Sequence, residues 1–512
     1  MTLLRFLSTV LLMGGLLLTG CSLTPSMPTP EAEQELPDRF AAAPGDTTLP
    51  ATAADTTRYN PTRWWTGYND PALTALVDTA LAANLDLDVA RARLEELAAQ
   101  FRIARAPLFP SINANGQANY QNQPANTGIG GAIGGGDGGG SGQPSPGEGQ
   151  QQQFPDRFEF TTYQATLGVS YELDFWGRVR NQRNAALNQY FATAADLQTA
   201  RLSVISQTIS TYAQIAALQQ QVRLGKRTVD LLEQRLEITD DRYARGLLPS
   251  FQLYTVRQSL QAARADQPDL ENQLYDAQSR LATLLGRFAG QQHAVLPDSM
   301  SVPLAPEPIP AGLPSDLLMQ RPDVRAAARR LEATRQQIGA ARAELLPSLS
   351  LTGQGGTQSS DLVELVDPGQ VFVNFVGQLT APLFQGGRLR ANLSAAEARY
   401  KQQVARYEQT VLTAFQEVKA ALVAYDKQRR RYREVQRQVE TAEDAFQTQR
   451  DRYERGIGDV LALLDAERGL VQARTRRAGV RLAVVNARLA LHRALGGSWT
   501  DAPPPDDPRL LQ

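Results

Sequence analysis

The chain has very few of the residues that build reactive centres. Its 512 residues include one cysteine, Cys21, and two histidines, His293 and His492. A single cysteine excludes a disulfide within the chain, even in an oxidising compartment. Neither histidine has a cysteine or an acidic residue at the spacing of metal ligands. We therefore predict no metal site, no cofactor and no disulfide framework.

Long hydrophobic runs and an excess of one charge are also lacking. After the N-terminal region, no segment reaches the ~18 consecutive apolar residues of a membrane-spanning helix. The net charge of −1 implies no bulk attraction to nucleic acid. The glycine-rich run at 130–140 lacks the Gly-Lys-Ser/Thr ending of a phosphate-binding loop. No pair of carboxylates stands out for acid–base work, so we predict that the chain is not an enzyme.

The N-terminus has the pattern of a bacterial lipoprotein signal at residues 1–20. Arg5 precedes an apolar run at 6–18, which is followed by Leu-Thr-Gly and then Cys21. Cleavage before Cys21 would leave it as the first residue, ready for lipid attachment. Ser22, where aspartate would favour retention in the inner membrane, favours delivery to the outer membrane. Residues 21–62 are rich in Pro, Ala and Thr, and we predict a lipid-anchored extended tether.

Most of the remaining chain is an internal duplication. The motif at 241–246 recurs at 451–456, an offset of 210, and further upstream the offset becomes 237. The difference of 27 residues lies in the Gly- and Gln-rich stretch of the first copy. This period is too long for a solenoid repeat. We predict a first repeat at 63–300, a Pro-rich linker at 301–314, a second repeat at 315–498 and a C-terminal tail at 499–512.

Each repeat begins with a helical pattern followed by two strand patterns. The helices are predicted at 71–106 and 315–345, and prolines end both. Apolar and polar residues alternate without exception over 162–175, and less strictly over 371–383, where Phe372 and Val376 interrupt the pattern. Shorter partner strands are predicted at 111–122 and 348–357, so each repeat supplies one hairpin.

The alternating strands permit two interpretations. At about 13 residues they exceed the ~9–11 residues that a transmembrane strand needs, and alternation is typical of barrel strands. A two-sided sheet on a soluble core would show the same alternation. Four strands leave open edges, which cannot lie in lipid. If the strands cross a membrane, several chains must therefore share one barrel.

A very long helix follows each hairpin, at 177–245 and 387–455. At 1.5 Å per residue, each is on the order of 100 Å long. Apolar residues recur every seven positions, which indicates coiled-coil packing. Gly246 and Gly456 stand where a left-handed cap ends a helix, and return helices are predicted at 251–285 and 460–495. Each repeat therefore contains an antiparallel helical hairpin with a tight tip. The heptad series are Ile215, Val222, Val229, Leu236 and Tyr243, and Val411, Val418, Tyr425, Tyr432, Val439, Phe446 and Tyr453.

The tip of the second hairpin carries two aspartates with different explanations. Asp459 is placed to cap the return helix and to interact with its dipole. Asp465 lies nearly two turns further along the helix, beside apolar residues, and a capping role does not explain it. The tip is therefore the best functional candidate in the sequence.

These motifs resemble outer-membrane efflux proteins of the TolC/OprM type, in the NodT-like lipoprotein branch of tripartite efflux systems. The resemblance covers about 64–497. It rests on the duplicated Arg-Tyr-x-x-Gly tips, Leu464-Asp465-Ala466, Phe175-Trp176-Gly177-Arg178, the run 382–388 and the lipobox.

The resemblance implies a mixed α/β membrane protein. Three chains of four strands would form one 12-stranded outer-membrane β-barrel, continued by a long periplasmic α-helical barrel. This homotrimer would be a passive exit duct, working with a periplasmic adaptor and an inner-membrane pump, most often of the resistance-nodulation-division type. An alternative is a lipid-anchored periplasmic coiled-coil structural protein, which would need neither the strands nor the glycine joints. Whether the cargo is drugs, metal ions or protein stays open.

The resemblance also assigns roles to residues of this chain. Leu461 and Asp465 match the constriction that closes the periplasmic entrance, where three copies of Asp465 would surround the axis. An arginine that helps to lock the tip in TolC is replaced here by Gly458, so the locking contacts must differ. The helical-hairpin tips expected to contact the adaptor are Arg245, Gly246, Arg455 and Gly456, and the barrel–helix joints are Gly177, Gly386 and Gly387.

Overall fold

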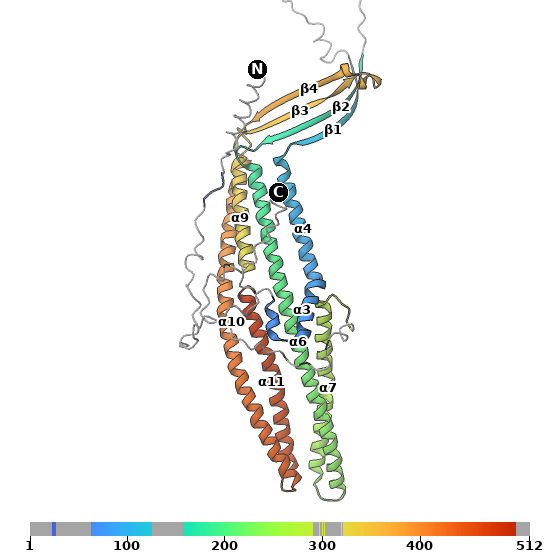
Figure 1. The fold of residues 1–512 in the computed structure, drawn as a ribbon, viewed down its shortest axis with the longest axis vertical. Helices are drawn as coiled ribbons and strands as arrows, with labels where there is room; N and C mark the ends of the chain where they lie inside the picture. Colours follow the sequence, from blue (N-terminus) through green and yellow to red (C-terminus); the bar gives the residue numbers. More distant parts are fainter. Residues whose placement is uncertain are drawn as a thin grey trace, which may run out of the picture. The chain divides into compact units, whose positions relative to one another are not determined.

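A computed structural model describes residues 23–26, 63–124, 157–289, 296, 300, 302, 319 and 321–497 (Figure 1). The predicted signal at 1–20, Cys21, most of the tether, nearly all of the linker and the tail at 499–512 lie outside the described residues. The chain divides into two compact units, and each unit draws on both repeats. Among the described residues, the first contains 23–25, 101–124, 157–184 and 335–397, and the second contains 26, 63–100, 185–289, 321–334 and 398–497.

The first unit is built on a four-stranded antiparallel sheet with the order β1-β2-β3-β4 (Figure 1). The strands are β1 (Ser111–Pro124), β2 (Arg157–Leu173), β3 (Ser348–Ser359) and β4 (Val371–Thr380). Both predicted hairpins are present, and β2 also pairs with β3, which joins the two repeats in one sheet. Because pairing stops at β1 and β4, both of these strands are edges.

The two faces of the sheet differ sharply in polarity. Val169 pairs with Ile112 on one side and with Gly353 on the other, and Gly353 pairs with Phe375, so these side positions share one face. Paired residues point to the same side of a sheet. Ile112, Val169 and Phe375 therefore lie on one face, and their side chains make it apolar. The opposite face carries mainly amides and hydroxyls, interrupted by Phe160, Phe372 and Val376. Its polar members are Asn113, Asn115, Gln117, Gln164, Thr166, Ser170, Ser350, Thr352, Gln354, Asn374 and Gln378.

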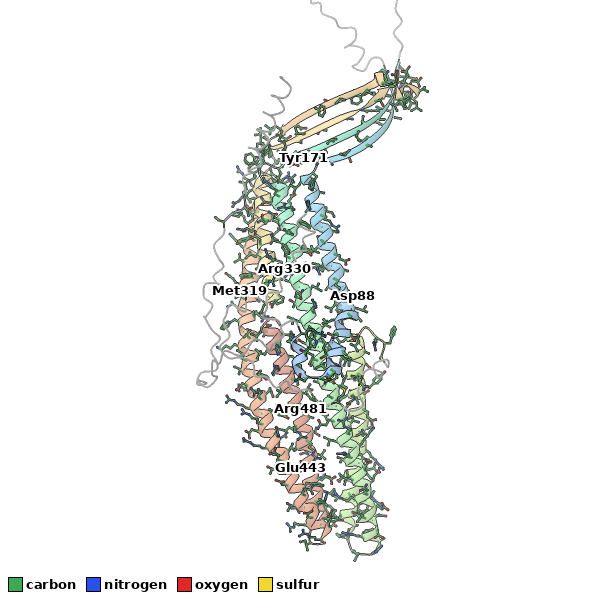
Figure 2. The ribbon with its side chains drawn as sticks, viewed as in Figure 1. Asp88, Tyr171, Met319, Arg330, Glu443 and Arg481 are labelled. Atoms are coloured by element: carbon green, nitrogen blue, oxygen red, sulfur yellow. The ribbon has the colours of Figure 1, made fainter. Side chains whose placement is uncertain are left out.

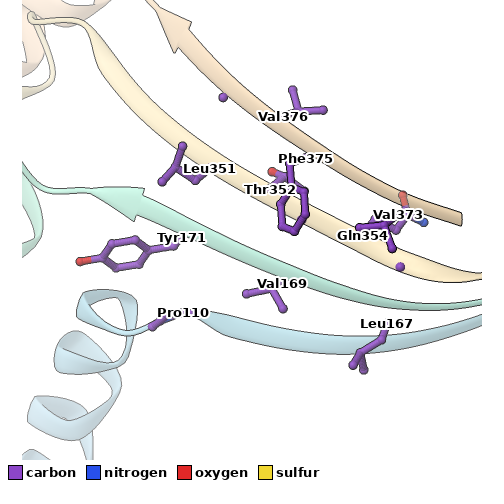
Figure 3. A pocket seen from close by; sticks show the side chains of 13 residues that line it. Pro110, Leu167, Val169, Tyr171, Leu351, Thr352, Gln354, Val373, Phe375 and Val376 are labelled. Atoms are coloured by element: carbon purple, nitrogen blue, oxygen red, sulfur yellow. The ribbon is translucent and has the colours of Figure 1, made fainter. Parts of the chain in front are cut away.

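Glycines hollow the apolar face (Figure 3). Gly353, Gly355 and Gly377 contribute no side chain, and a hollow of about 720 Å³ forms above them. Phe375 lies over Gly353, where an added Cβ would come within 2.9 Å of its ring. The side chain of Phe375 is nevertheless 82% exposed in a single chain, so this face needs an apolar environment.

The helix predicted at 71–106 is in fact two helices, so that prediction was wrong. α3 (Pro71–Ala83) ends at Asn84, whose ψ of 123° is extended, and α4 (Leu85–Arg105) begins after it. The Asn84 amide oxygen accepts from Leu87 N at 3.2 Å and so caps α4. The predicted start of α3 is confirmed, because Asp70 accepts from the backbone N–H groups of Ala72 and Leu73.

Two helical hairpins follow the pattern predicted from the heptads. α6 (Arg178–Ala244) and α10 (Arg388–Glu454) each contain 67 residues, and α7 (Ser250–Leu284) and α11 (Val460–Ala494) return along them. α9 (Pro322–Ala343) precedes β3. In the heptad series, Ile215, Val222, Val411, Val418, Tyr425 and Val439 are buried, as coiled-coil positions require. Short 3₁₀ helices occupy Trp64–Tyr68, Ala106–Leu108, Val363–Val366 and Pro368–Gln370.

The repeats are also equivalent in their contacts. Asn84 and Arg321 are related by the offset of 237, and Leu284 and Ala494 by the offset of 210. The Asn84 amide nitrogen donates to Leu284 O at 3.0 Å, and Arg321 Nη1 donates to Ala494 O at 2.8 Å. In each repeat, a polar side chain before a helix therefore binds a carbonyl at the end of that repeat's return helix.

Candidate functional site

Both hairpin tips end their first helix in the same way. Gly246 and Gly456 have φ angles of 71° and 76°, the left-handed conformation expected from the sequence. Gly456 N donates to Tyr453 O and Ile457 N donates to Arg452 O, each at 3.0 Å. This pair of bonds is the Schellman motif, which satisfies the last carbonyls of the helix. The tip turns are therefore defined by the backbone and stay compact.

The second tip needs glycine at position 458 for a steric reason. A Cβ on Gly458 would lie 2.7 Å from Tyr453 N and 2.9 Å from Arg452 C, so a side chain would collide with the backbone of α10. After Gly458, the Asp459 carboxylate accepts from Leu461 N at 3.2 Å and caps α11. Asp459 is thus an N-cap, as its sequence position indicated.

The first two turns of α11 present two different faces. Val460, Leu463, Leu464 and Glu467 are buried. Leu461 is half-buried, and the side chain of Asp465 is 79% exposed, with Arg468 Nη1 3.9 Å from its carboxylate. Since positions 461 and 465 are four residues apart, they share one face of the helix. The structure therefore brings both predicted gate residues to the same face, outside the buried seam.

The buried seam packs against the first hairpin. Leu464 forms a small apolar cluster with Leu232 of α6 and with Val256 and Leu260 of α7. This cluster is one of the contacts between the second hairpin and the first near the tips. Burying each such side chain contributes roughly 1.5–3 kcal/mol, so the hairpins do not separate without a substantial cost.

A buried ion pair lies beside this cluster. Arg235 Nη1 of α6 donates to Glu467 Oε2 of α11, and the two side chains are only 9% and 7% exposed. The pattern of charges along these helices did not reveal this pair, because Arg235 and Glu467 are one arginine and one glutamate among many. A spatial pairing across 232 residues has no local sequence signal.

Two further contacts join the hairpins close to the tips. Arg242 Nη1 of α6 donates to the hydroxyl of Tyr453 at 3.2 Å, and its guanidinium lies 5.2 Å from the centre of the Tyr453 ring. Arg468 of α11 donates to the hydroxyl of Ser259 of α7. The arms of the second hairpin are tied by Arg474, which donates to Glu443 at 2.6 Å (Figure 2 labels Glu443). Together these contacts fix Leu461 and Asp465 in position.

The predicted joints lie between strand and helix in the first unit. Gly177, Gly386 and Gly387 have φ angles of 74°, 57° and 82°, which disfavour any other residue. Asp174 caps α6 by accepting from Val179 N and Arg180 N at 3.1 and 2.8 Å. The indole N–H of Trp176 donates to Pro347 O at 2.8 Å. This bond joins the segment after β2, in the first repeat, to the residue before β3, in the second repeat.

Within 63–124, 157–289 and 321–497, no three metal-binding side chains come together. Over the same residues, no helix combines the length and apolarity needed to cross a bilayer. His492 is packed inside the second unit, stacked on Trp64 with ring centres 4.4 Å apart. Burial, and then the charge of Arg488, lowers the pKa of His492 to about 3, so the imidazole is neutral.

Comparisons with known proteins agree with this geometry. The family described as "Outer membrane efflux protein" matches residues 76–287 and 313–497. The chain is 32% identical over 492 residues to the probable efflux pump outer membrane protein TtgC of Pseudomonas putida, covering 94% of each chain. It is 34% identical over 456 residues to the outer membrane protein OprJ of Pseudomonas aeruginosa, covering 86% of each.

Solved structures share the whole fold. A membrane protein from Pseudomonas aeruginosa is 30% identical and superposes with a TM-score of 0.78 over 93% of this chain and 100% of that chain. The outer-membrane channel OprN is 28% identical, with a TM-score of 0.78 over 94% of this chain and 100% of that chain. The predicted fold class, four strands per chain with long helical hairpins, is confirmed by these likenesses.

Proposed function

The chain belongs to the outer membrane efflux protein family, and we propose how its residues build and close the export passage. It is an outer-membrane channel through which an efflux pump discharges. The observation that carries this conclusion is the joint presence, in one chain, of an open four-stranded sheet with one apolar face and two long helical hairpins with locked tips. The resemblance seen in the sequence is thus confirmed, and a purely structural coiled-coil protein would leave the sheet unexplained.

Three copies of the chain complete the channel. The edges β1 and β4 carry unpaired backbone groups, which lipid cannot satisfy. Joining β4 of one copy to β1 of the next removes every edge, and three copies make a 12-stranded barrel. Leu379 of the edge strand β4 is 70% exposed in the isolated chain and lies on the same face as Phe375, which suits a side chain that contacts lipid.

The polarity of the two faces of the sheet decides which face contacts lipid. In a membrane barrel the apolar side faces outwards and the polar side lines the passage. The face with Val169, Leu351 and Phe375 is therefore the lipid face. The amides and hydroxyls of the opposite face then line the lumen, and the described part of that wall contains Glu172 as its one charged residue, paired with Arg178 at 2.7 Å. A wall of neutral polar groups allows water to fill the passage and does not bind ions strongly.

The gate lies at the tip of the second hairpin. Leu461 and Asp465 face away from the buried seam, so in a trimer they converge on the axis and narrow the entrance. The cluster around Leu464 and the Arg235–Glu467 pair hold each hairpin inward. Opening requires the second hairpin to separate from the first and so exposes these groups. Gly177, Gly386 and Gly387 act as the joints between barrel and helices.

The tips are the contact surface for the other components of the pump. A periplasmic adaptor would meet the tip residues Arg245, Gly246, Arg455 and Gly456. Beside them, Leu247 and Ile457 are 68% and 69% exposed, which suits an apolar contact flanked by cations. An inner-membrane pump of the resistance-nodulation-division type would supply the energy, and the duct itself conducts passively.

The cargo is proposed to be small organic molecules. Support comes from the names of relatives, which include a toluene efflux pump protein of Pseudomonas putida at 32% identity and an antibiotic efflux pump protein at 32% identity. We further propose that Cys21 is acylated and anchors the protein in the outer membrane. Mass spectrometry of the N-terminal peptide tests this, since an unmodified peptide beginning elsewhere contradicts it.

Complementation tests the function as a whole. In a strain that lacks its own exit duct but carries the neighbouring pump and adaptor genes, expression of this chain should restore export of a dye or solvent. A variant that lacks residues 388–494 and so both arms of the second hairpin should not. Restoration by neither protein, with both present in the outer membrane, would contradict an export role.

A further inference from the structure

The first 62 residues contain one short described segment, Leu23, Thr24, Pro25 and Ser26, and its first three residues belong to the first unit. The first three of these residues are half-buried. The hydroxyl of Thr24 donates to the side-chain oxygen of Asn181 at 3.0 Å. Asn181 is in the first turn of α6 and is only 4% exposed. A segment on a loose tether would not be buried in this way, so this contact needs an explanation.

The receiving site is closely packed around a glycine. A Cβ on Gly339 of α9 would lie 3.1 Å from the Thr24 hydroxyl and 2.6 Å from the Asn181 amide nitrogen. Both neighbours would have to move to admit it. Gly339 therefore makes the space in which Thr24 reaches Asn181.

The duplication provides an internal comparison. Asn181 corresponds to Ala391 by the offset of 210, and Gly339 corresponds to Arg102 by the offset of 237. Neither repeat-related residue preserves the site, since alanine cannot accept the bond and arginine adds bulk where glycine leaves space. Within the described residues, the repeat-related positions therefore form no second site of this kind. The Asn181–Gly339 pair is therefore specialised and is not a general feature of the repeat.

The site lies beside the joint between sheet and helix. Asn181 N donates to Gly177 O at 2.9 Å, so Asn181 is one turn from the glycine that precedes α6. Cys21 is three residues before Thr24. An extended chain spans at most about 3.6 Å per residue, which keeps Cys21 within roughly 11 Å of the bound Thr24.

We propose that Asn181 and Gly339 form a docking site for the chain's own N-terminal segment, which fixes the lipid-bearing Cys21 beside the barrel–helix joint. The lipid anchor then holds the joint at the membrane surface. Without docking, the anchor would be connected to the joint only through a free tether. This inference rests on the proposed acylation of Cys21. The docking itself rests on the contacts of Thr24 and is measured separately.

Site-directed spin labelling tests the docking in the assembled protein. Cys21 is the natural chain's only cysteine and does not react once acylated, so Ser26→Cys gives one labelled site. The nitroxide should be immobilised in the parent protein and mobile in Gly339→Val. Gly479→Val is the matched control, because Gly479 is also a helical glycine and has nothing within 4 Å of its Cβ position. The control should keep the immobilised spectrum.

Thr24 offers a second pair of variants that does not disturb the helices. Thr24→Val removes the donor and keeps the shape, and should release the label. Thr24→Ser keeps the donor and should retain the immobilised spectrum. Power saturation with oxygen and a water-soluble nickel complex should show one fixed depth in the parent and a broad, shallower average in the released variants.

The outcomes separate the two proposals. Equal mobility in the parent, Gly339→Val and Thr24→Val overturns the docking site, whatever the state of Cys21. An N-terminal peptide that carries no lipid mass overturns the acylation. Cys21→Ser is then added so that Ser26→Cys remains the one labelled site, and an immobilised spectrum leaves the docking intact. A label that is released in the variants without any change in depth overturns the positioning of the anchor.

Discussion

Arg235 and Glu467 are 232 positions apart, yet they form an ion pair in the buried contact between α6 and α11. Each comes from a different repeat, so the pair joins the two hairpins near their tips. Burying two charges carries a desolvation cost that largely offsets their attraction. The pair therefore adds little net stability, but it penalises every arrangement in which one partner is buried alone.

This relationship predicts how the gate responds to substitution. Arg235→Leu leaves Glu467 uncompensated, and Glu467→Leu does the same to Arg235, so either change should destabilise the contact between α6 and α11 by about 3–5 kcal/mol. Each single variant should show more frequent open events in planar bilayers. The double variant removes both charges and should return most of the way to the parent. Additive effects of the two substitutions would show that the residues do not act as a pair.

The predicted ring of carboxylates is tested by comparing two aspartates of one tip. Asp465→Ala should raise the conductance and weaken block by divalent cations, because an acidic ring attracts cations. Asp459→Ala removes only the N-cap of α11, with an expected loss of about 1 kcal/mol of local stability and nearly unchanged selectivity. Conductance and reversal potential in asymmetric salt measure both effects. The opposite pattern, with Asp459→Ala opening the channel and Asp465→Ala silent, would assign the ring to the wrong residue.

The burial of His492 predicts that the second unit loses stability as the pH falls. Its pKa is about 3 in the folded protein, because burial and the neighbouring Arg488 disfavour the imidazolium, against about 6.5 in an unfolded chain. The unfolded form therefore binds the extra proton, and stability falls as the pH drops from about 6.5 towards 3. Thermal unfolding followed by circular dichroism at pH 7.5 and 4.5 should show a smaller acid-induced fall in Tm for His492→Gln than for the parent. An equal fall would show that other groups carry the acid sensitivity.

Replacing a joint glycine should lower the free energy of unfolding through the backbone conformation alone. Gly387 has a φ of 82°, and nothing lies within 4 Å of the position of its Cβ. Gly387→Ala should therefore destabilise the junction by about 1–2 kcal/mol through the left-handed conformation, without a clash. The yield of heat-resistant trimer on a gel, with Gly479→Ala as the helical control, measures the effect. Unchanged yield and Tm in Gly387→Ala would mean that the joint relaxes to another conformation.

Periodicity made much of the fold predictable. Strands β1 to β4 and helices α6, α7, α10 and α11 were placed within a few residues, because alternation and heptads repeat over many positions. The break at Asn84 was missed, since its signal is one capping residue followed by Asp86 and Asp88 inside an otherwise continuous helical pattern. A cap of that kind is visible in hindsight as Asn-Leu-Asp-Leu-Asp at 84–88.

Contacts between distant segments were not predictable in the same way. Asp465 stood out by its position in the tip sequence, whereas Leu461 and the gate role of both residues came from a resemblance. Their shared face follows from helical spacing. Neither Arg235–Glu467 nor Thr24–Asn181 has a local pattern, because each depends on which helices become neighbours after folding. Gly339 illustrates this point, since in sequence it is an unremarked helical glycine and in the structure it makes room for another segment.

The central claim is that this chain forms a passage closed at the second-hairpin tips, and single-channel conductance in planar bilayers tests it most directly. The purified parent trimer should give a small conductance. Leu461→Ala/Asp465→Ala, which widens the constriction and leaves the buried seam in place, should give a severalfold larger one. Equal conductance of the two proteins, or none from either with trimers inserted in the bilayer, would contradict a gate formed by these residues.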